Sequence, residues 1–532
     1  MPSQSIHLPS RKWSVVALSS VSLAIVFVSY LLAFVLAVVF LLLPVALFVL
    51  VPAGEGNLFF IRLLVSAFGL AVGLSILWSL VPRKNRFDPN GVPIDLSKER
   101  RLTREIEAIA AALREPMPTE VYLLADANAF VMETAGFTGI GNRRIMGLGL
   151  PLLQMLSIAQ FRAILAHEFA HYYSGDTRLG PWVYSTQRTM VRIFENLGRK
   201  SEVLRFLTRW AVVAVLYKLL MIAMRAYWRF FLRVTQAISR RQEFRSDELA
   251  CYITGSQAFI EGLEGVRKCQ PGVQSYWGSF VVPAAMNGYR PALADGFLRF
   301  MQAPQIAKAA SEYLAQQAAI AKTSPFDSHP ALNKRIDKAK LLNLSAPEGS
   351  PAESTSSQPM ISLIDDLAPL ETSLLKKLIP AAATADLKPL NWETAGADIY
   401  IPMWRKQVAP FLSLLSTKKL SELPTLVLNL RALAIYVPHP PGVRLNQGQQ
   451  DARALDVLTC AFALCLFENG WKLIVEPGNL ALESGETKIG PGGVVGTIRA
   501  GKLTIAEWSS FCAQRGIGDW PLVSSVPAPA TL

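Results

Sequence analysis

The longest stretch without a charged residue most constrains how this chain can fold. Residues Ser14–Val51 contain no Asp, Glu, Lys or Arg, and a second apolar run follows at Leu63–Val81. A bilayer core takes about 20 apolar residues in a helix, so both runs are long enough to cross a membrane. The first run is also far longer than the ~7–15 apolar residues of a signal peptide. The sequence therefore predicts a membrane anchor rather than a cleaved leader.

The basic residues that flank these runs indicate how often the chain crosses. They precede the first run and follow the second. Because basic flanks favour the cytoplasmic side, two flanks on one side require two crossings. We expect an anchor over residues 1–82, with spans at about 14–51 and 63–81, in a plasma membrane or bacterial inner membrane. The remaining chain then faces the cytoplasm. Pro44 leaves open whether the first run is one kinked helix or a hairpin.

Composition argues against two other classes of protein. The net charge is +13, but the basic residues cluster beside the apolar runs, where anionic lipid headgroups attract them. No nucleic-acid motif is present, so we expect no nucleic acid as a partner. The five cysteines are odd in number and form no Cys-x-x-Cys pair. This disfavours a disulfide framework or a cysteine zinc site and fits a reducing compartment.

The strongest chemical signal is the segment His167–His171, which reads His-Glu-Phe-Ala-His. Two histidines four residues apart lie about 40° apart around a helix, so both imidazoles can share one metal ion. Glu168, directly after the first histidine, can reach a water molecule on that ion. This pattern is typical of zinc peptidases, and Ser157–Tyr173 has the spacing of a helix. The alternative is a surface helix with two solvated histidines.

A catalytic zinc ion usually has three protein ligands, and Glu243 and Asp247 are the best candidates for the third. They are four residues apart, so they share one helix face. One carboxylate can bind the ion, while the other accepts the free N–H of a ligating histidine. From spacing alone, a solvated acidic pair among arginines is an equal alternative.

Between the histidine motif and these carboxylates lies a basic apolar segment, residues 206–233. Its basic residues recur at helical spacing and form one stripe: Lys218, Arg225, Arg229 and Arg233. A helix that lies at the membrane surface, in the interface, fits this pattern best. A third membrane span and an ordinary core helix are the alternatives.

The remaining pattern predicts the fold class. Short strands at Glu120–Leu124 and Arg144–Leu148 alternate with helices, so we expect a membrane-anchored, mainly α protein with a small β-sheet. Composition shifts predict three divisions in the C-terminal part of the chain: a linker at 343–360, a C-terminal accessory α+β domain at 361–520 and a flexible tail at 521–532. Within the accessory domain we expect one helix and four strands, at Ala452–Phe467, Trp471–Val475, Leu480–Glu483, Val494–Arg499 and Lys502–Trp508.

Five segments carry a resemblance to a known family: Asp126–Phe130, His167–His171, Ser174–Asp176, Ser239–Asp247 and Ser328–Ile336. In this order they resemble the membrane-bound zinc metallopeptidases that include the CaaX prenyl proteases and the bacterial HtpX-type heat-shock proteases. The resemblance covers about Lys98 to Leu342 and implies a zinc metallopeptidase domain with a zincin-like fold at 98–342. Such relatives have further spans between the zinc helix and the third ligand, where this chain shows only the basic apolar segment. The linker and C-terminal domain are additions.

The resemblance implies a metal centre. One Zn²⁺ per chain is bound by His167, His171 and Glu243. Glu168 is the general base that takes a proton from the zinc-bound water, and zinc polarises the scissile carbonyl. Two acidic residues are implied to support the ligands without binding the ion: Asp247 and Asp176.

The resemblance also implies contacts with a substrate. His329 and Arg335 approach the oxyanion or the substrate as catalytic residues, and Asn128 holds substrate backbone. The strand just before the zinc helix resembles the edge strand that binds an extended peptide in zincins. Its expected substrate-binding residues are Arg144, Ile145 and Met146.

We therefore expect an integral-membrane zinc-dependent endopeptidase that hydrolyses peptide bonds of membrane or membrane-proximal proteins, with protein quality control as its setting. Its partners are a polypeptide substrate and the lipid bilayer. One alternative is a processing protease dedicated to one lipidated or prenylated substrate. Another is a catalytically silent membrane scaffold, against which the intact motif argues.

Overall fold

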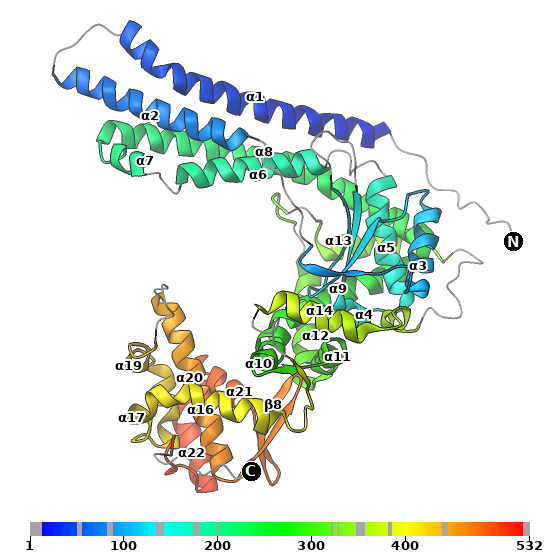
Figure 1. Cartoon of the computed structure of the whole chain (residues 1–532), viewed down its shortest axis with the longest axis vertical. Coiled ribbons are helices and arrows are strands. Elements are labelled where there is room, and N and C mark those ends of the chain that lie inside the picture. Colours follow the sequence, from blue (N-terminus) through cyan, green and yellow to red (C-terminus); the bar gives the residue numbers. More distant parts are fainter. Residues whose placement is uncertain are drawn as a thin grey trace, which may run out of the picture. The chain divides into compact units, whose positions relative to one another are not determined.

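The computed structural model shows a mainly helical protein with small β-sheets, as the sequence predicts (Figure 1). Its described residues fall into two compact units: unit 1, Met1–Gln270 and Glu312–Leu367, and unit 2, Pro271–Ser311 and Ala368–Leu532. The domain bounds expected from sequence stay a prediction. The structure describes residues 13–50, 56–81, 89–134, 143–173, 180–198, 202–320, 323–327, 329–346, 357–380, 386–438 and 445–524.

Unit 1 opens with two apolar helices that pack against each other, α1 at Trp13–Leu50 and α2 at Asn57–Leu80. Helix α1 continues through Pro44, so the first apolar run is one helix and not a hairpin. Among the described residues, three helices are long and apolar enough to cross a membrane by length and composition. They are Ala24–Leu50, Asn57–Leu80 and Ala211–Thr254.

The interval between the histidine motif and Glu243 holds three helices: α6 at Gly180–Gly198, α7 at Glu202–Leu207 and α8 at Ala211–Thr254. Of these three described helices, only α8 is long and apolar enough to cross a membrane, which agrees with the single basic apolar segment expected there. Charged residues lower the hydropathy of α6, so the apolar pattern of the sequence did not reveal this helix. All three helices share an apolar cluster with α1 and α2, whose buried members are Ala37, Leu64, Phe68, Val72, Ile76, Ile193, Leu197, Leu204, Leu207, Val213 and Leu220.

Helix α8 connects this cluster to the rest of unit 1. Leu220 near its start is buried in the apolar cluster, whereas Glu243 near its end is buried against α5. The basic stripe of the 206–233 segment is exposed on the same helix. One continuous helix of 44 residues therefore carries both a candidate span and a candidate metal ligand.

A four-stranded sheet lies beside these helices in unit 1, with the order β1-β2-β4-β3. Strands β1 and β2 are antiparallel, β2 and β4 are parallel, and β3 and β4 are antiparallel. Strand β4 is paired on both sides, so the prediction that it is an edge strand is wrong. The strands are β1 at Gly91–Ile94, β2 at Glu120–Leu124, β3 at Ala129–Thr134 and β4 at Arg143–Gly149.

Helix α5, at Ile158–Tyr173, packs on this sheet and on α8. A capping box begins it: the Ser157 hydroxyl accepts from the Gln160 amide at 3.2 Å, and the Gln160 side chain accepts from the Ser157 amide at 3.0 Å. The other helices of unit 1 are α3 at Arg100–Ala112, α4 at Leu150–Met155, most of α9 at Ser256–Tyr276, α13 at Leu332–Leu342 and the 3-10 turn Met360–Leu363.

Unit 2 combines helices with a three-stranded antiparallel sheet in the order β7-β8-β9. The predicted helix and first two strands of the C-terminal region are confirmed as α20 at Gln447–Glu468, β7 at Lys472–Glu476 and β8 at Asn479–Ser484. The next two predicted strands are wrong. Val494–Arg499 lies in α21 at Pro491–Arg499, and Lys502–Trp508 forms a turn and the start of α22 at Ile505–Arg515.

The remaining elements of unit 2 are short. Its third strand is β9 at Thr487–Ile489, and a two-stranded sheet joins β5 at Tyr289–Arg290 to β6 at Lys388–Pro389. The other helices are α10 at Val282–Met286, α11 at Leu293–Gln302, the first half of α12 at Pro304–Ala319, α14 at Leu367–Leu378, α16 at Ile401–Val408, α17 at Leu412–Leu415, α18 at Leu423–Leu428 and α19 at Arg431–Ala434.

Candidate metal centre

Helix α5 presents the two histidines of the motif on one face. Its apolar residues, among them Phe161, Leu165 and Phe169, are buried in the core. This anchoring turns His167 and His171 toward α8, and their Nε2 atoms lie 3.3 Å apart.

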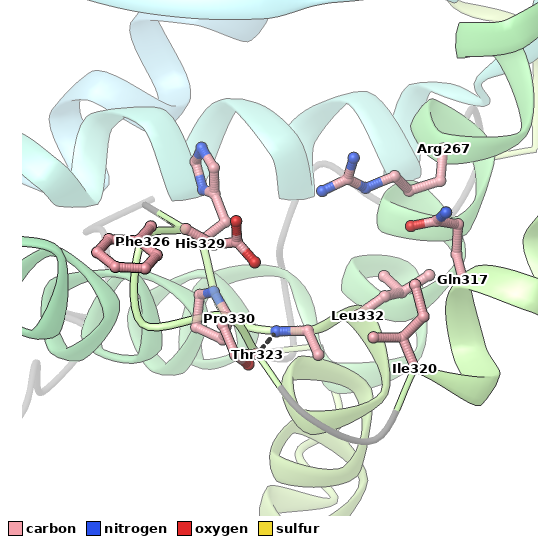
Figure 2. Close-up of a pocket in the computed structure, with 10 residues that line it drawn as sticks. Arg267, Gln317, Ile320, Thr323, Phe326, His329, Pro330 and Leu332 are labelled. Carbon is pink, nitrogen blue, oxygen red and sulfur yellow. Dashed lines mark hydrogen bonds between the residues drawn. The ribbon is translucent and has the colours of Figure 1, made fainter. Parts of the chain in front are cut away.

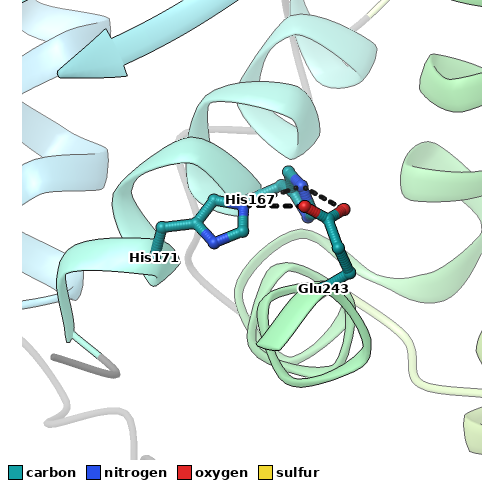
Figure 3. Close-up of side chains that lie close together, drawn as sticks. All are labelled: His167, His171 and Glu243. Carbon is teal, nitrogen blue, oxygen red and sulfur yellow. Dashed lines mark hydrogen bonds and ion pairs between the residues drawn. The ribbon is translucent and has the colours of Figure 1, made fainter. Parts of the chain in front are cut away.

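Helix α8 supplies the third side chain (Figure 3). Glu243 is buried, with Oε2 3.6 Å from Nε2 of His167 and Oε1 3.6 Å from Nε2 of His171. One ligand atom from each of the three residues lies within 4.8 Å of the others. The structure thus brings together the three residues expected to bind metal.

The spacing of these atoms suits a zinc ion. Tetrahedral ligands about 2.0–2.1 Å from an ion lie roughly 3.3–3.4 Å from each other. The observed separations of 3.3 and 3.6 Å match this geometry closely. Two imidazole nitrogens and a carboxylate oxygen are also a donor set that zinc accepts. The residues present therefore fit the expected ion.

The outer nitrogen of each histidine faces an oxygen from α8. His167 Nδ1 lies 3.0 Å from Asp247 Oδ1, and His171 Nδ1 lies 3.1 Å from the Ser246 hydroxyl. A partner at Nδ1 fixes the ring orientation and leaves the Nε2 lone pair for a metal. Asp247 occupies the place expected from sequence. Ser246 was not predicted, although it is three residues from Glu243 and so lies on the same helix face.

Arg335 of α13 holds Asp247 in place. Its guanidinium donates two hydrogen bonds to the carboxylate, at 2.9 and 2.6 Å, and its side chain is buried. Nη2 of Arg335 also lies 3.4 Å from Nε2 of His167. The sequence placed Arg335 near the oxyanion or the substrate, whereas the structure directs it onto the ligand side chains. We therefore treat Arg335 as a positioning residue.

The electrostatics of the centre favour a cation. Burial by itself would lower the pKa of His167, but hydrogen bonds to Asp247 and Glu243 raise it to about 9. Burial also opposes the charge on Arg335, yet Asp247 and Glu243 keep its pKa above the ordinary arginine value. In the metal-free protein, a proton on His167 thus supplies positive charge that a bound metal ion would replace.

Glu168 and His329 are more exposed than the ligand candidates His167 and Glu243. Glu168 follows His167 on α5 and is partly exposed. The His329 side chain is 54% exposed, and its Nδ1 lies 2.9 Å from Oε2 of Glu243. His329 therefore contacts the buried carboxylate of Glu243 from the solvent-exposed side, near the site where the sequence predicted it.

The structure describes no contact between the three ligand candidates and the other site residues predicted from the sequence. Asp176 lies outside the described residues. Asn128 is exposed directly before β3, and no described contact joins it to the three ligand candidates. Strand β4 buries the side chains expected to touch substrate: Arg144, Ile145 and Met146.

Arg144 has structural partners that the sequence did not reveal. Its guanidinium pairs with Glu133 at 2.9 Å and with Glu115 at 3.1 Å, and lies 4.1 Å from the ring centre of Tyr172. A surface for an extended peptide is therefore not provided by β4, because its backbone is paired on both sides and its side chains face the core.

Comparison with known proteins agrees with this geometry. Residues 96–342 match the profile of peptidase family M48. Protease HtpX of Xylella fastidiosa strain 9a5c is 28% identical over 125 residues, which are 23% of this chain and 43% of that protein. Protease HtpX of Idiomarina loihiensis is 23% identical over 198 residues, or 37% of this chain and 66% of the relative. Protease HtpX of Pseudomonas putida KT2440 is 26% identical over 172 residues, 32% of this chain and 56% of the relative.

The chain thus spans between 43% and 66% of the length of these relatives. The matched segment begins after α2 and ends with α13, so it contains all three ligand candidates. This segment therefore matches the M48 peptidase family, and the relatives that it resembles are HtpX proteases.

Proposed function

We propose that this protein is an integral-membrane zinc-dependent endopeptidase that cleaves membrane or membrane-proximal proteins in quality control. The observation that carries the proposal is the convergence of His167, His171 and Glu243 at metal-binding distances. Asp247 and Ser246 support it, because each partners the outer nitrogen of one histidine. The M48 match over the same residues supports a zincin-like fold for the helix and sheet that carry the site.

Each residue of the site has a separate role in peptide-bond hydrolysis. When bound, zinc polarises the scissile carbonyl and lowers the pKa of a water molecule. Glu168 accepts the proton from the attacking water and passes it to the leaving amine, as a partly exposed carboxylate can. His329 orients the reacting groups from the solvent side. Arg335 acts through Asp247, since it fixes the carboxylate that fixes His167.

Strand β3 replaces β4 as the proposed binding edge for substrate. Within the described sheet, β3 pairs only with β4 and no described strand lies on its other side, where an extended peptide could add. Helix α5 packs against β3, which keeps that edge near the zinc helix. Asn128 directly precedes this strand and is exposed to a peptide lying there.

The length of helix α8 supports a position of the metal centre outside the bilayer. Phe60 at the start of α2 makes an edge-to-face contact with Trp210 just before α8, with ring centres 4.9 Å apart, so the starts of α2 and α8 lie at one end. From there to Glu243, α8 rises about 50 Å at ~1.5 Å per residue. A hydrocarbon core is only about 30 Å thick, so the site would stand about 20 Å beyond it. The basic residues that flank the apolar runs support the cytoplasm as this side.

The test is proteolysis by protein purified in detergent and loaded with zinc. We expect the wild type to cleave unfolded casein, and Glu168→Gln to retain zinc but lose cleavage by about 10²–10⁴-fold. A metal-loaded wild type that cleaves neither casein nor a membrane-anchored unfolded protein would contradict the proposal. Cleavage of one anchored substrate alone would instead favour a dedicated processing protease.

A further inference from the structure

A pocket of about 360 Å³ opens beside the candidate metal centre in unit 1. Figure 2 shows Arg267 of α9 and Gln317 of α12 on one side, and Phe326 and His329 of the connecting loop on the other. Its volume lies within the range of about 300–1,000 Å³ that small-ligand pockets occupy. Such a space is large enough for a side chain of a bound polypeptide.

The pocket and the metal centre share His329. This residue lines the pocket, while its Nδ1 lies 2.9 Å from Oε2 of the ligand candidate Glu243. A polypeptide held for cleavage at the metal centre would therefore pass the mouth of the pocket. One of its side chains near the scissile bond can enter.

Arg267 contributes a guanidinium to the lining of the pocket. Its side chain is half-buried and donates to the Gln270 amide oxygen at 3.1 Å. No acidic side chain of the described residues lies within ion-pair distance of it. A carboxylate in the pocket would supply that partner without displacing an existing ion pair.

The one carboxylate in the lining, Asp327, is held within its own loop. Asp327 Oδ2 accepts a hydrogen bond from the Ser324 amide at 3.1 Å, which closes the turn of the lining loop. The remaining lining is largely apolar, with Ile320, Pro330 and Leu332. The stem of a Glu side chain can pack on such a surface while its carboxylate reaches the guanidinium.

We propose that this pocket is a specificity subsite that selects an acidic side chain of the substrate through Arg267. The inference rests on the proposed peptidase function and deepens it, because it names a residue that sets cleavage preference. Arg267 acts on substrate choice and lies outside the ligand set, so its replacement leaves the metal centre intact.

The test compares short peptides in which one Glu, Gln or Lys is moved through every position of an otherwise neutral sequence. Cleavage sites and rates are read by mass spectrometry. We expect Glu to be favoured over Gln by about five- to tenfold at one position relative to the scissile bond, as one charge-assisted hydrogen bond allows. Arg267→Gln reduces this ratio to near one, and Arg267→Lys keeps most of it. Lys268→Gln, at the neighbouring position on α9, leaves the ratio unchanged.

Three results would overturn the inference: equal rates for Glu and Gln peptides, a preference for Lys, or a Glu preference that survives in Arg267→Gln. Failure of the peptidase function itself is distinguished by a binding measurement. Fluorescence anisotropy of the same labelled peptides with zinc-loaded Glu168→Gln protein reports the subsite without cleavage. There too, tighter binding of the Glu peptide must depend on Arg267, and binding that is independent of Arg267 refutes the subsite.

Discussion

Asp247 is the residue whose replacement probes the candidate metal centre most sharply. Its Oδ1 lies 3.0 Å from Nδ1 of His167 and accepts from Arg335 at 2.6 Å, while Oδ2 accepts from Arg335 at 2.9 Å. Asp247→Asn keeps the shape of the side chain but removes its charge and turns an amide N–H₂ toward one of these donors. Arg335, which is buried, is then left without its main counter-charge.

Two magnitudes follow from these contacts. Loss of a partner that orients a metal-binding histidine typically lowers metal affinity by about 10–100-fold. Loss of one member of a buried ion pair costs about 3–5 kcal/mol of folding free energy. For a domain of this size that corresponds to a fall of roughly 6–20 °C in the melting temperature of the metal-free protein.

The assay measures zinc affinity by competition with a chelator and thermal unfolding of the chelated protein. A double variant separates the two effects. Asp247→Leu combined with Arg335→Met removes both charges, so it should regain much of the stability that Asp247→Leu alone loses. Its zinc affinity should stay low, because His167 still lacks its partner. Wild-type zinc affinity in Asp247→Asn would refute the positioning role.

Three further predictions concern other parts of the molecule. The stability that a protonated His167 gives the metal-free protein is fully present below the unfolded pKa of about 6.5 and lost as pH rises through about 9. Zinc affinity should therefore rise as the pH increases from about 6.5 to about 9, since zinc must displace the proton on His167. Zinc affinity measured by chelator competition at these two pH values checks this prediction. Asn57→Cys and Lys98→Cys should react with a membrane-impermeant maleimide only from opposite sides of the membrane; the native cysteines are buried, so background is low. Gly149→Ala should cost about 3 kcal/mol, because a Cβ there would lie 2.1 Å from the Asp126 carbonyl oxygen. Gly448→Ala, in helix α20 with its nearest contact at 3.5 Å, should leave the melting temperature unchanged or raise it slightly.

Local spacing made the core of the site predictable. The interval between His167 and His171 fixes a shared helix face regardless of tertiary context, and the structure has that face. Glu243 was identified by resemblance, since spacing alone could not separate it from a solvated acidic pair. Its approach to the histidines depends on the packing of α8 against α5, which no local pattern records.

The wrong secondary-structure and sheet-order predictions have physical causes. The order of strands in a sheet depends on contacts distant in sequence, so β4 was taken for an edge strand, although its burial on both faces is typical of an internal strand. The strand predicted at Lys502–Trp508 overlooked a capping box, in which Thr504 and Glu507 begin α22. In α21, Pro491 at the first turn favours a helix start over a strand.

The most direct test of the account is zinc K-edge X-ray absorption on the purified, zinc-loaded protein. We predict one zinc ion per chain, with two imidazole nitrogens and carboxylate or water oxygens at about 2.0–2.2 Å. Glu243→Ala should lose one oxygen ligand and most of the zinc. A zinc–sulfur shell at about 2.3 Å, or a protein that binds no zinc, would contradict the assignment of His167, His171 and Glu243 as the metal centre.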